Sequence, residues 1–148
     1  MDEVQRVIDY IAANRFPFPG QTDWPPGYRT VVNGGHRVVS IPGPNGPHWP
    51  DIVVLDQAGT PVRFGEVQTV VGPDAVARWQ ISSWAADRLN ETGVKNLFVY
   101  VPVGSAPAAL ELLDRHEISF AGLRDYEIKG GEVRVRPIIT RGDLYDLQ

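Results

Sequence analysis

Two carboxylates stand at apolar runs of the sequence, where a buried charge is costly unless it has a partner. Asp51 directly precedes the run Ile-Val-Val-Leu, and Glu66 interrupts a second run that continues to Val70. Gln68 follows Glu66 by two residues, so in a strand its amide lies on the same face as the glutamate. Two acids that share one face either share a proton or bind a cation, and magnesium is the hard cation that carboxylate oxygens suit.

The spacing of the two acids predicts that they face each other across a β-hairpin. If residues 57–60 form a four-residue loop, Asp56 pairs with Pro61, and the same register pairs Asp51 with Glu66. Directly opposed side chains lie on one face of the hairpin, with Cβ atoms about 5 Å apart. A loop that is one residue shorter or longer would place the acids on opposite faces.

A purely structural interpretation accounts for the same two acids. Asp51 would cap the start of its strand, and Glu66 would pair with an arginine such as Arg63 or Arg78. The spacing by itself leaves the metal site and the salt bridges open as alternatives.

The pattern around the acids predicts the α/β class, with a mixed β-sheet flanked by helices. Helices are expected over residues 2–14, 72–93 and 105–117, and the proline-rich stretches 16–28 and 42–50 are expected to be loops. Strands are expected at residues 36–41, 51–56, 62–70, 96–102 and 118–123, with a closing hairpin around Gly130 and Gly131. The strand–helix–strand unit at 62–102 favours a parallel strand pair, and the hairpin before it is antiparallel.

The composition and the net charge exclude several classes of protein and of functional site. The 148 residues include no cysteine, which excludes disulfides, zinc–thiolate sites and cysteine nucleophiles and favours a cytoplasmic location. No apolar run approaches the roughly 18 residues of a membrane span, and the acidic N-terminus is unlike a signal peptide. The net charge of −4 argues against a binder that holds nucleic acid by a basic stripe, although bound metal ions can supply part of the charge that a nuclease needs.

The motif and the order of the secondary-structure elements together resemble those of the PD-(D/E)xK nuclease superfamily, the restriction-endonuclease-like proteins. The first part of the family pattern is Pro-Asp at the start of a strand, and Pro50-Asp51 matches it. The second part, on the next strand, is a Glu or Asp, then any residue, then a Lys. Glu66-Val67-Gln68 matches this part except at the lysine. The family core of a helix, three antiparallel strands, a helix and a parallel strand fits residues 2–102. The resemblance implies that Asp51, Glu66 and the backbone carbonyl of Val67 hold Mg²⁺ or Mn²⁺. It also implies a single domain over 1–148, with additions to the core at 105–148.

The chain departs from the family at the lysine. Gln68 can hold a water molecule but has no charge and cannot act as a base near neutral pH. Arg78, early in the second helix, is the candidate substitute that would clamp phosphate, and its alternative role is to cover apolar surface with its stem. Glu3 is the candidate for the first-helix glutamate of the family, or else an acid favoured by the helix dipole. Gln80 and Trp84 resemble the Gln-x-x-x-Tyr motif of RecB-like members, with Trp in place of Tyr.

Three functions follow from these residues. The first is magnesium-dependent hydrolysis of phosphodiester bonds, and the second is a nuclease fold without catalysis that serves as a binding or accessory module. Gln68 and the acidic pI of about 5.3 favour the second function. The third is an ordinary α/β domain whose acids make salt bridges. Nucleic acid and a second copy of the chain are the partners compatible with the resemblance, whereas a membrane is not.

Overall fold

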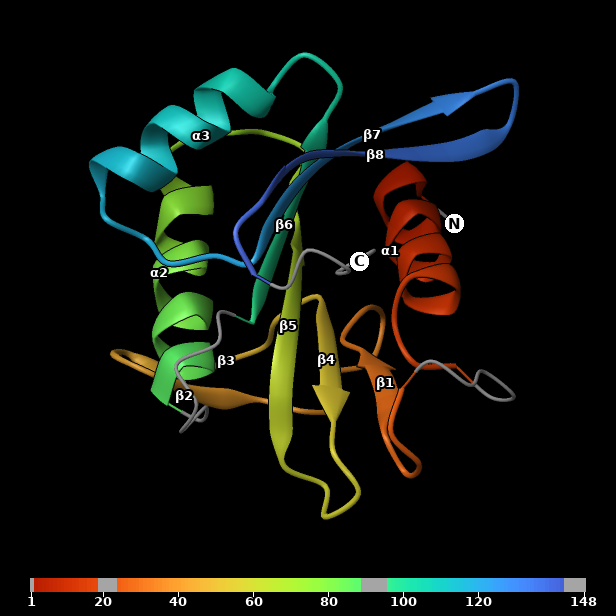
Figure 1. Ribbon diagram of the computed structural model, residues 1–148, viewed down its shortest axis with the longest axis vertical. Helices are drawn as coiled ribbons and strands as arrows, with labels where there is room; N and C mark the ends of the chain where they lie inside the picture. The colour runs from red at the N-terminus through yellow and green to blue at the C-terminus, as the bar shows by residue number, and fades with distance from the viewer. Residues whose placement is uncertain (1, 19–23, 89–95, 143–148) are drawn as a thin grey trace.

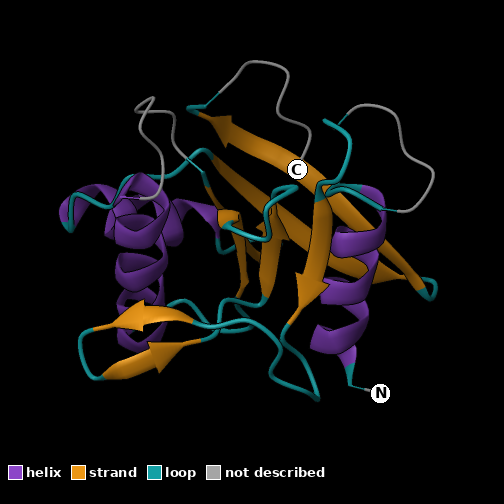
Figure 2. Ribbon diagram, turned by 90° about the horizontal axis from the view of Figure 1, so that it is seen from below, coloured by secondary structure: helices purple, strands orange, loops and turns teal. Residues whose placement is uncertain are grey.

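The computed structural model describes residues 2–18, 24–88 and 96–142. Within them, six strands form a mixed sheet in the order β1-β4-β5-β6-β7-β8, and β2 and β3 form a separate hairpin. Helix α1 covers one face of the sheet, and α2 and α3 cover the other (Figure 1). The small hairpin lies beside α2 (Figure 2). The α/β class and the mixed sheet flanked by helices are therefore confirmed.

The helices are α1 (Glu3–Asn14), α2 (Pro73–Arg88) and α3 (Ala106–Arg115). The strands are β1 (Arg29–Val32), β2 (Ile41–Gly43), β3 (Gly46–His48), β4 (Ile52–Leu55), β5 (Pro61–Val67), β6 (Leu97–Pro102), β7 (Gly122–Lys129) and β8 (Glu132–Thr140). Strand β5 pairs with β6 in parallel and β6 with β7 in parallel, whereas the other neighbouring pairs of the sheet are antiparallel.

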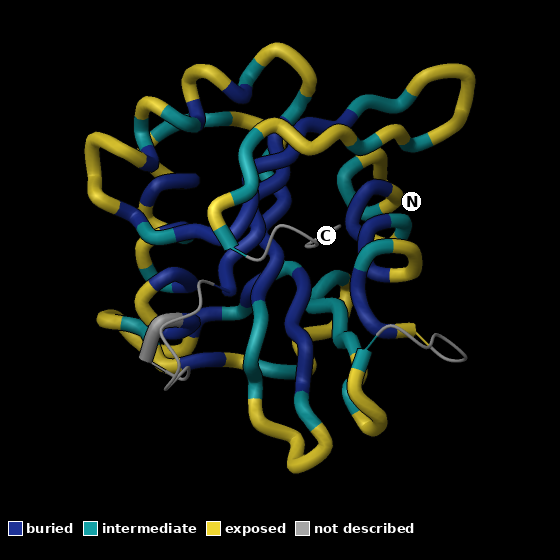
Figure 3. Tube along the Cα trace, in the orientation of Figure 1, coloured by how far each residue is buried: buried dark blue, intermediate teal, exposed yellow. Residues whose placement is uncertain are grey.

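Burial on both faces explains the apolar character of the central strands. All four residues of β4 are buried, and the first five residues of β6 are buried as well. Such strands lose the alternation of apolar and polar residues because helices cover both of their faces. Figure 3 shows the buried residues gathered along these central strands and along the inward faces of the helices.

The register of the β4–β5 hairpin around Ile52 is the one predicted from a four-residue loop at 57–60. Ile52 faces Gly65, and continuing this register by one residue places Asp51 opposite Glu66. The two acids therefore lie at the same end of the hairpin, where β4 begins and β5 ends.

The expected loop of this hairpin is wrong in detail. Leu55, not Asp56, faces Pro61, because the pairing shifts between Val54 and Leu55. The Asp56 carboxylate instead accepts hydrogen bonds from the amides of Ala58 and Thr60, both at 2.9 Å. Asp56 thus closes the turn. Because the pairing shifts by one residue at Leu55, the pairs from Ile52 to Val54 have the register that the expected loop would have given.

Three expected elements also differ. The strand expected at 36–41 is absent from the sheet, and the chain pairs with β4 through residues 29–32 instead. The side chain of Asn33 bonds the backbone groups of Val38 and Val39, so these groups are satisfied without strand pairing. The loop expected at 42–50 contains most of the β2–β3 hairpin, and the strand expected at 118–123 begins only at Gly122. The end of the second expected helix, beyond Arg88, falls at 89–95, outside the described residues.

Among the described residues, no helix combines the length and the apolar character that a membrane crossing requires.

Candidate functional site

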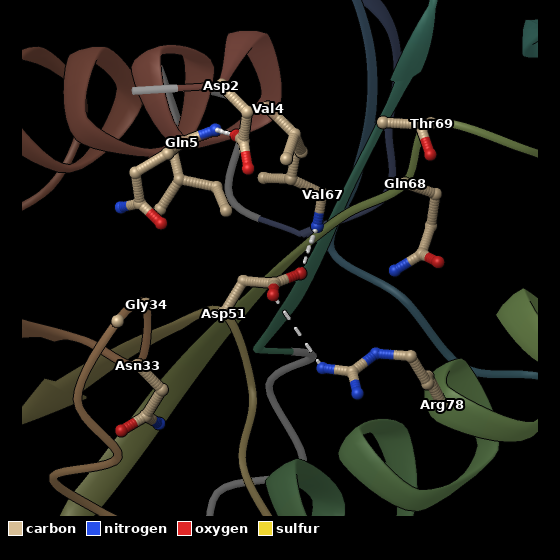
Figure 4. Close-up of a pocket in the computed structure, with 12 residues that line it drawn as sticks. Asp2, Val4, Gln5, Asn33, Gly34, Asp51, Val67, Gln68, Thr69 and Arg78 are labelled. Carbon is tan, nitrogen blue, oxygen red and sulfur yellow. Dashed lines mark hydrogen bonds and ion pairs between the residues drawn. The ribbon is translucent and has the colours of Figure 1, made fainter.

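Asp51 lines a pocket of about 580 Å³ at the end of the sheet where α1 begins (Figure 4), and Glu66 is buried beside it. Asp51, Val67, Gln68 and Arg78 line this pocket, together with the first residues of α1 and the loop that follows β1. The lining residues come from segments that are distant in sequence, so the pocket exists only when the sheet, α1 and α2 are assembled.

Glu66 is fully buried and receives three hydrogen-bond contacts from side chains. Ser82 Oγ donates to Glu66 Oε1 at 2.7 Å, and His48 Nε2 lies 3.0 Å from the same oxygen. Arg78 Nε donates to Glu66 Oε2 at 3.0 Å. These contacts supply the partners without which a buried carboxylate would be very costly.

The contacts of His48 also exclude a nucleophile relay. Its Nε2 lies 3.2 Å from Ser82 Oγ and 3.0 Å from Glu66 Oε1, so one ring nitrogen faces both groups. A serine–histidine–acid relay needs the two ring nitrogens to face different partners. His48 and Ser82 therefore hold Glu66 in place.

Asp51 is held less firmly than Glu66. Its Oδ2 accepts a hydrogen bond of 2.8 Å from the amide of Val67, and its Oδ1 lies 3.7 Å from Arg78 Nη2 (Figure 4). Burial and, to a smaller extent, the charge of Glu66 raise the pKa of Asp51 from 3.8 to about 7, against the opposing effects of the Val67 amide and the charge of Arg78. A carboxyl with such a pKa is typical of functional sites, where acids are held close together.

Arg78 bridges the two acids from α2. It also donates from Nη2 to the backbone carbonyl of Trp49 at 2.9 Å. The pairing of Glu66 with Arg78 is the one foreseen in the salt-bridge interpretation. Arg63 instead lies over the ring of Trp24, 4.8 Å from the ring centre.

Gln68 presents its side chain to the pocket from a fixed backbone. Its amide donates to the carbonyl of Tyr100 at 2.9 Å, and its own carbonyl accepts a hydrogen bond of 2.6 Å from the Tyr126 hydroxyl. Its side-chain amide has no hydrogen-bond partner among the residues that the structure describes and points into the pocket (Figure 4). Burial raises the pKa of Tyr126 to about 12, and the charge of Asp51 adds to this effect, so the tyrosine remains a donor at neutral pH.

The remaining candidates lie outside this pocket. Glu3 lines a neighbouring pocket of about 380 Å³ with Tyr126, whereas Asp2, which caps α1, and Gln5 of α1 line the pocket of Asp51. Gln80 is exposed on α2, and the side chain of Trp84 is 52 % exposed. The structure thus brings Asp51, Glu66, Val67, Gln68 and Arg78 together and leaves Glu3 and Gln80 apart from them.

Sequence reasoning gave no role to His48, Ser82 or Asn33. Ser82 follows Arg78 by four residues, which places both on one helical face, so this spacing was an available signal. Asn33 bonds the carbonyl of Pro50 at 2.8 Å, and its amide donates to the carbonyl of Asp51 at 3.1 Å. The position of Asp51 therefore depends on the loop after β1, which no pattern in the sequence indicates.

The side chains around the pocket include oxygen atoms, which are the ligands that a hard cation takes. Asp51 Oδ1 lies at the pocket, 3.7 Å from Arg78 Nη2, and the Gln68 amide offers a neutral oxygen. The Val67 amide points toward Asp51, and the carbonyl of a strand residue points to the same edge as its amide. The described residues contain no group of three or more His, Cys, Asp or Glu side chains that could hold a metal ion. A metal held here would depend on water and phosphate for its other ligands, as magnesium commonly does.

No family model, no curated protein and no solved structure matches this chain. The resemblance to the PD-(D/E)xK superfamily therefore depends on the motif residues and the order of elements alone.

Proposed function

We propose that the chain is a metal-dependent nuclease of the PD-(D/E)xK type, which hydrolyses phosphodiester bonds in nucleic acid with Mg²⁺ or Mn²⁺. The observation that carries the proposal is that Asp51 lines an open pocket and Glu66 is buried beside it, with Arg78 in contact with both acids. The order of α1, antiparallel β1-β4-β5, α2 and parallel β6 supports the restriction-endonuclease-like core that the motif implies.

Five residues in or beside the pocket have a role in this hydrolysis. Asp51, Glu66 and the Val67 carbonyl would hold the metal, and a metal held there would lower the pKa of a water and neutralise charge on the phosphate. The Gln68 amide orients the attacking water by hydrogen bonds. Arg78 donates to the phosphate oxygens as their charge develops. In this hydrolysis the water oxygen would bond to phosphorus and lose a proton to solvent, while the bond from phosphorus to one sugar oxygen would break and that oxygen would take up a proton from solvent.

A second function, a nuclease-like module that binds without cleaving, is favoured by a separate observation. The acid Glu66 is already neutralised by Arg78, and position 68 carries no charge. A cytoplasmic location, nucleic acid as a partner and assembly with a second copy of the chain remain predictions under either function.

The test combines metal binding with cleavage. Calorimetric titration with Mg²⁺ and Mn²⁺ and cleavage of plasmid, single-stranded DNA and RNA would compare the native chain with Asp51→Asn. Asparagine keeps an acceptor for the Val67 amide, so the variant removes the charge with little change of shape. The matched control is Asp9→Asn, which changes an exposed aspartate that accepts a hydrogen bond from Gln5 on α1.

We expect the native chain and Asp9→Asn to bind metal and cleave, and Asp51→Asn to do neither. Gln68→Lys should retain cleavage, because it restores the more common residue of the motif, whereas Arg78→Ala should lose about 100-fold in rate, as when one transition-state donor is removed. Cleavage that persists in Asp51→Asn would point to a contaminant and exclude the nuclease. If the native chain binds metal but cleaves none of the substrates, the result would favour the second function, a module that binds without cleaving.

A further inference from the structure

The guanidinium of Arg78 lies between the two acids of the site. Its Nε is 3.0 Å from Glu66 Oε2, and its Nη2 is 3.7 Å from Asp51 Oδ1. One cation shared by two neighbouring carboxylates relieves their repulsion, which is the effect that a bound metal ion would have at the same place.

The two contacts of Arg78 differ in strength. The contact with Glu66 is a hydrogen bond to a fully buried carboxylate, and the arginine is also anchored by the Trp49 carbonyl at 2.9 Å. The contact with Asp51 is longer than a hydrogen bond. The Arg78 side chain is 35 % exposed and lines the pocket, so the guanidinium has open space beside it to turn into while Nη2 stays bonded to the Trp49 carbonyl.

We infer that Arg78 takes the place of the metal in the metal-free protein, and that divalent cation binding is an exchange in which its guanidinium leaves Asp51. This inference rests on the proposed function, since it concerns the same two acids. Asp51 keeps the Val67 amide as its anchor during the exchange, and Glu66 keeps His48 and Ser82. The arginine thus sets the metal affinity of the site and keeps the two acids compatible when no metal is bound.

The test measures Mg²⁺ affinity by calorimetry in the native chain, in Arg78→Met and in Arg134→Gln, at a pH of about 8 where Asp51 is largely ionised. Methionine keeps an unbranched apolar stem and removes the charge. Arg134 is a matched control, because it is 53 % exposed on β8 and pairs with Glu132 at 3.9 Å. We expect Arg78→Met to bind Mg²⁺ about tenfold more tightly than the native chain, or about 1.4 kcal/mol, and Arg134→Gln to bind as the native chain does.

The outcomes separate the inference from the function beneath it. Equal affinity in the native chain and Arg78→Met would overturn the inference and leave the nuclease standing. Mg²⁺ binding by Arg78→Met but not by the native chain would support the inference and contradict a magnesium site in the native chain. If neither protein binds Mg²⁺, both the inference and the proposed nuclease are overturned. If Arg78→Met does not fold, the NMR resonance of the Arg78 Nε–H group in the native chain tests the inference instead. We expect that resonance to shift as Mg²⁺ saturates the site, and a resonance that does not move at saturation would overturn the inference.

Discussion

Replacing Asp51 with asparagine should make the protein more stable at slightly alkaline pH and change its stability little in acid. The pKa of Asp51 is raised from 3.8 to about 7 by burial and by Glu66. Between these two values the folded state holds a proton that the unfolded state has released. The unfolding free energy therefore falls as the pH rises through this interval, and asparagine, which resembles the protonated carboxyl, avoids that loss.

The size of the effect follows from the size of the pKa shift. A shift of about 3 pH units, at 1.36 kcal/mol for each unit, gives about 4 kcal/mol above the folded pKa. This value is an upper bound, because part of the shift comes from Glu66 and is shared between the two acids. We therefore expect Asp51→Asn to raise the unfolding free energy by about 2 to 4 kcal/mol at a pH near 8, and by less than about 0.5 kcal/mol near pH 4.

Urea unfolding at a series of pH values, with a chelator present, measures this difference. Asp9→Asn is the matched control, and a surface change of this kind should stay within about 0.5 kcal/mol at every pH. A native chain that is more stable than Asp51→Asn in alkaline solution would refute the reasoning. That result would mean that the contact of Asp51 with Arg78 outweighs the cost of burying the carboxylate.

Two further substitutions test the groups that hold the site in place. Ser82→Ala should lower the unfolding free energy by about 1 to 3 kcal/mol, because buried Glu66 loses a charge-assisted hydrogen bond of 2.7 Å. Urea unfolding measures the change, and an unchanged midpoint would show that His48 and Arg78 satisfy Glu66 without the serine. Tyr126→Phe should cost about 1 kcal/mol, since the Gln68 carbonyl loses its donor at 2.6 Å. It should also weaken Mg²⁺ binding in calorimetry, and a loss of stability with unchanged metal affinity would give Tyr126 a structural role only.

The opposition of Asp51 and Glu66 could be predicted although the loop between their strands was wrong. The expected pairing of Asp56 with Pro61 does not occur, because the chain shifts by one position at Leu55. The register between the strands survives because a slip by one residue would turn every side chain of β5 to the other face of the sheet. Burial of Phe64 against the core, rather than the turn, decides which face Glu66 takes.

The first strand could not be predicted, because its residues carry too little of the pattern. Strand β1 has four residues, of which the first is exposed and the others are half-buried. The residues at 36–41 have the stronger apolar run, yet Asn33 bonds the backbone there and keeps the segment out of the sheet. A single side chain that satisfies several backbone groups leaves no signature in hydrophobic periodicity.

The sequence by itself predicted two adjacent strands with an acid at each, and it placed Glu66 and Gln68 on one face by strand alternation, whereas the face of Asp51 depended on the length assumed for the loop. Only the tertiary structure decided what meets them there. The packing of α2 on β5 brings Arg78 and Ser82 onto Glu66, and the path of the chain before β4 brings His48. Helical spacing predicts which residues share a face of α2. The position of α2 along β5 decides which of these residues reaches Glu66.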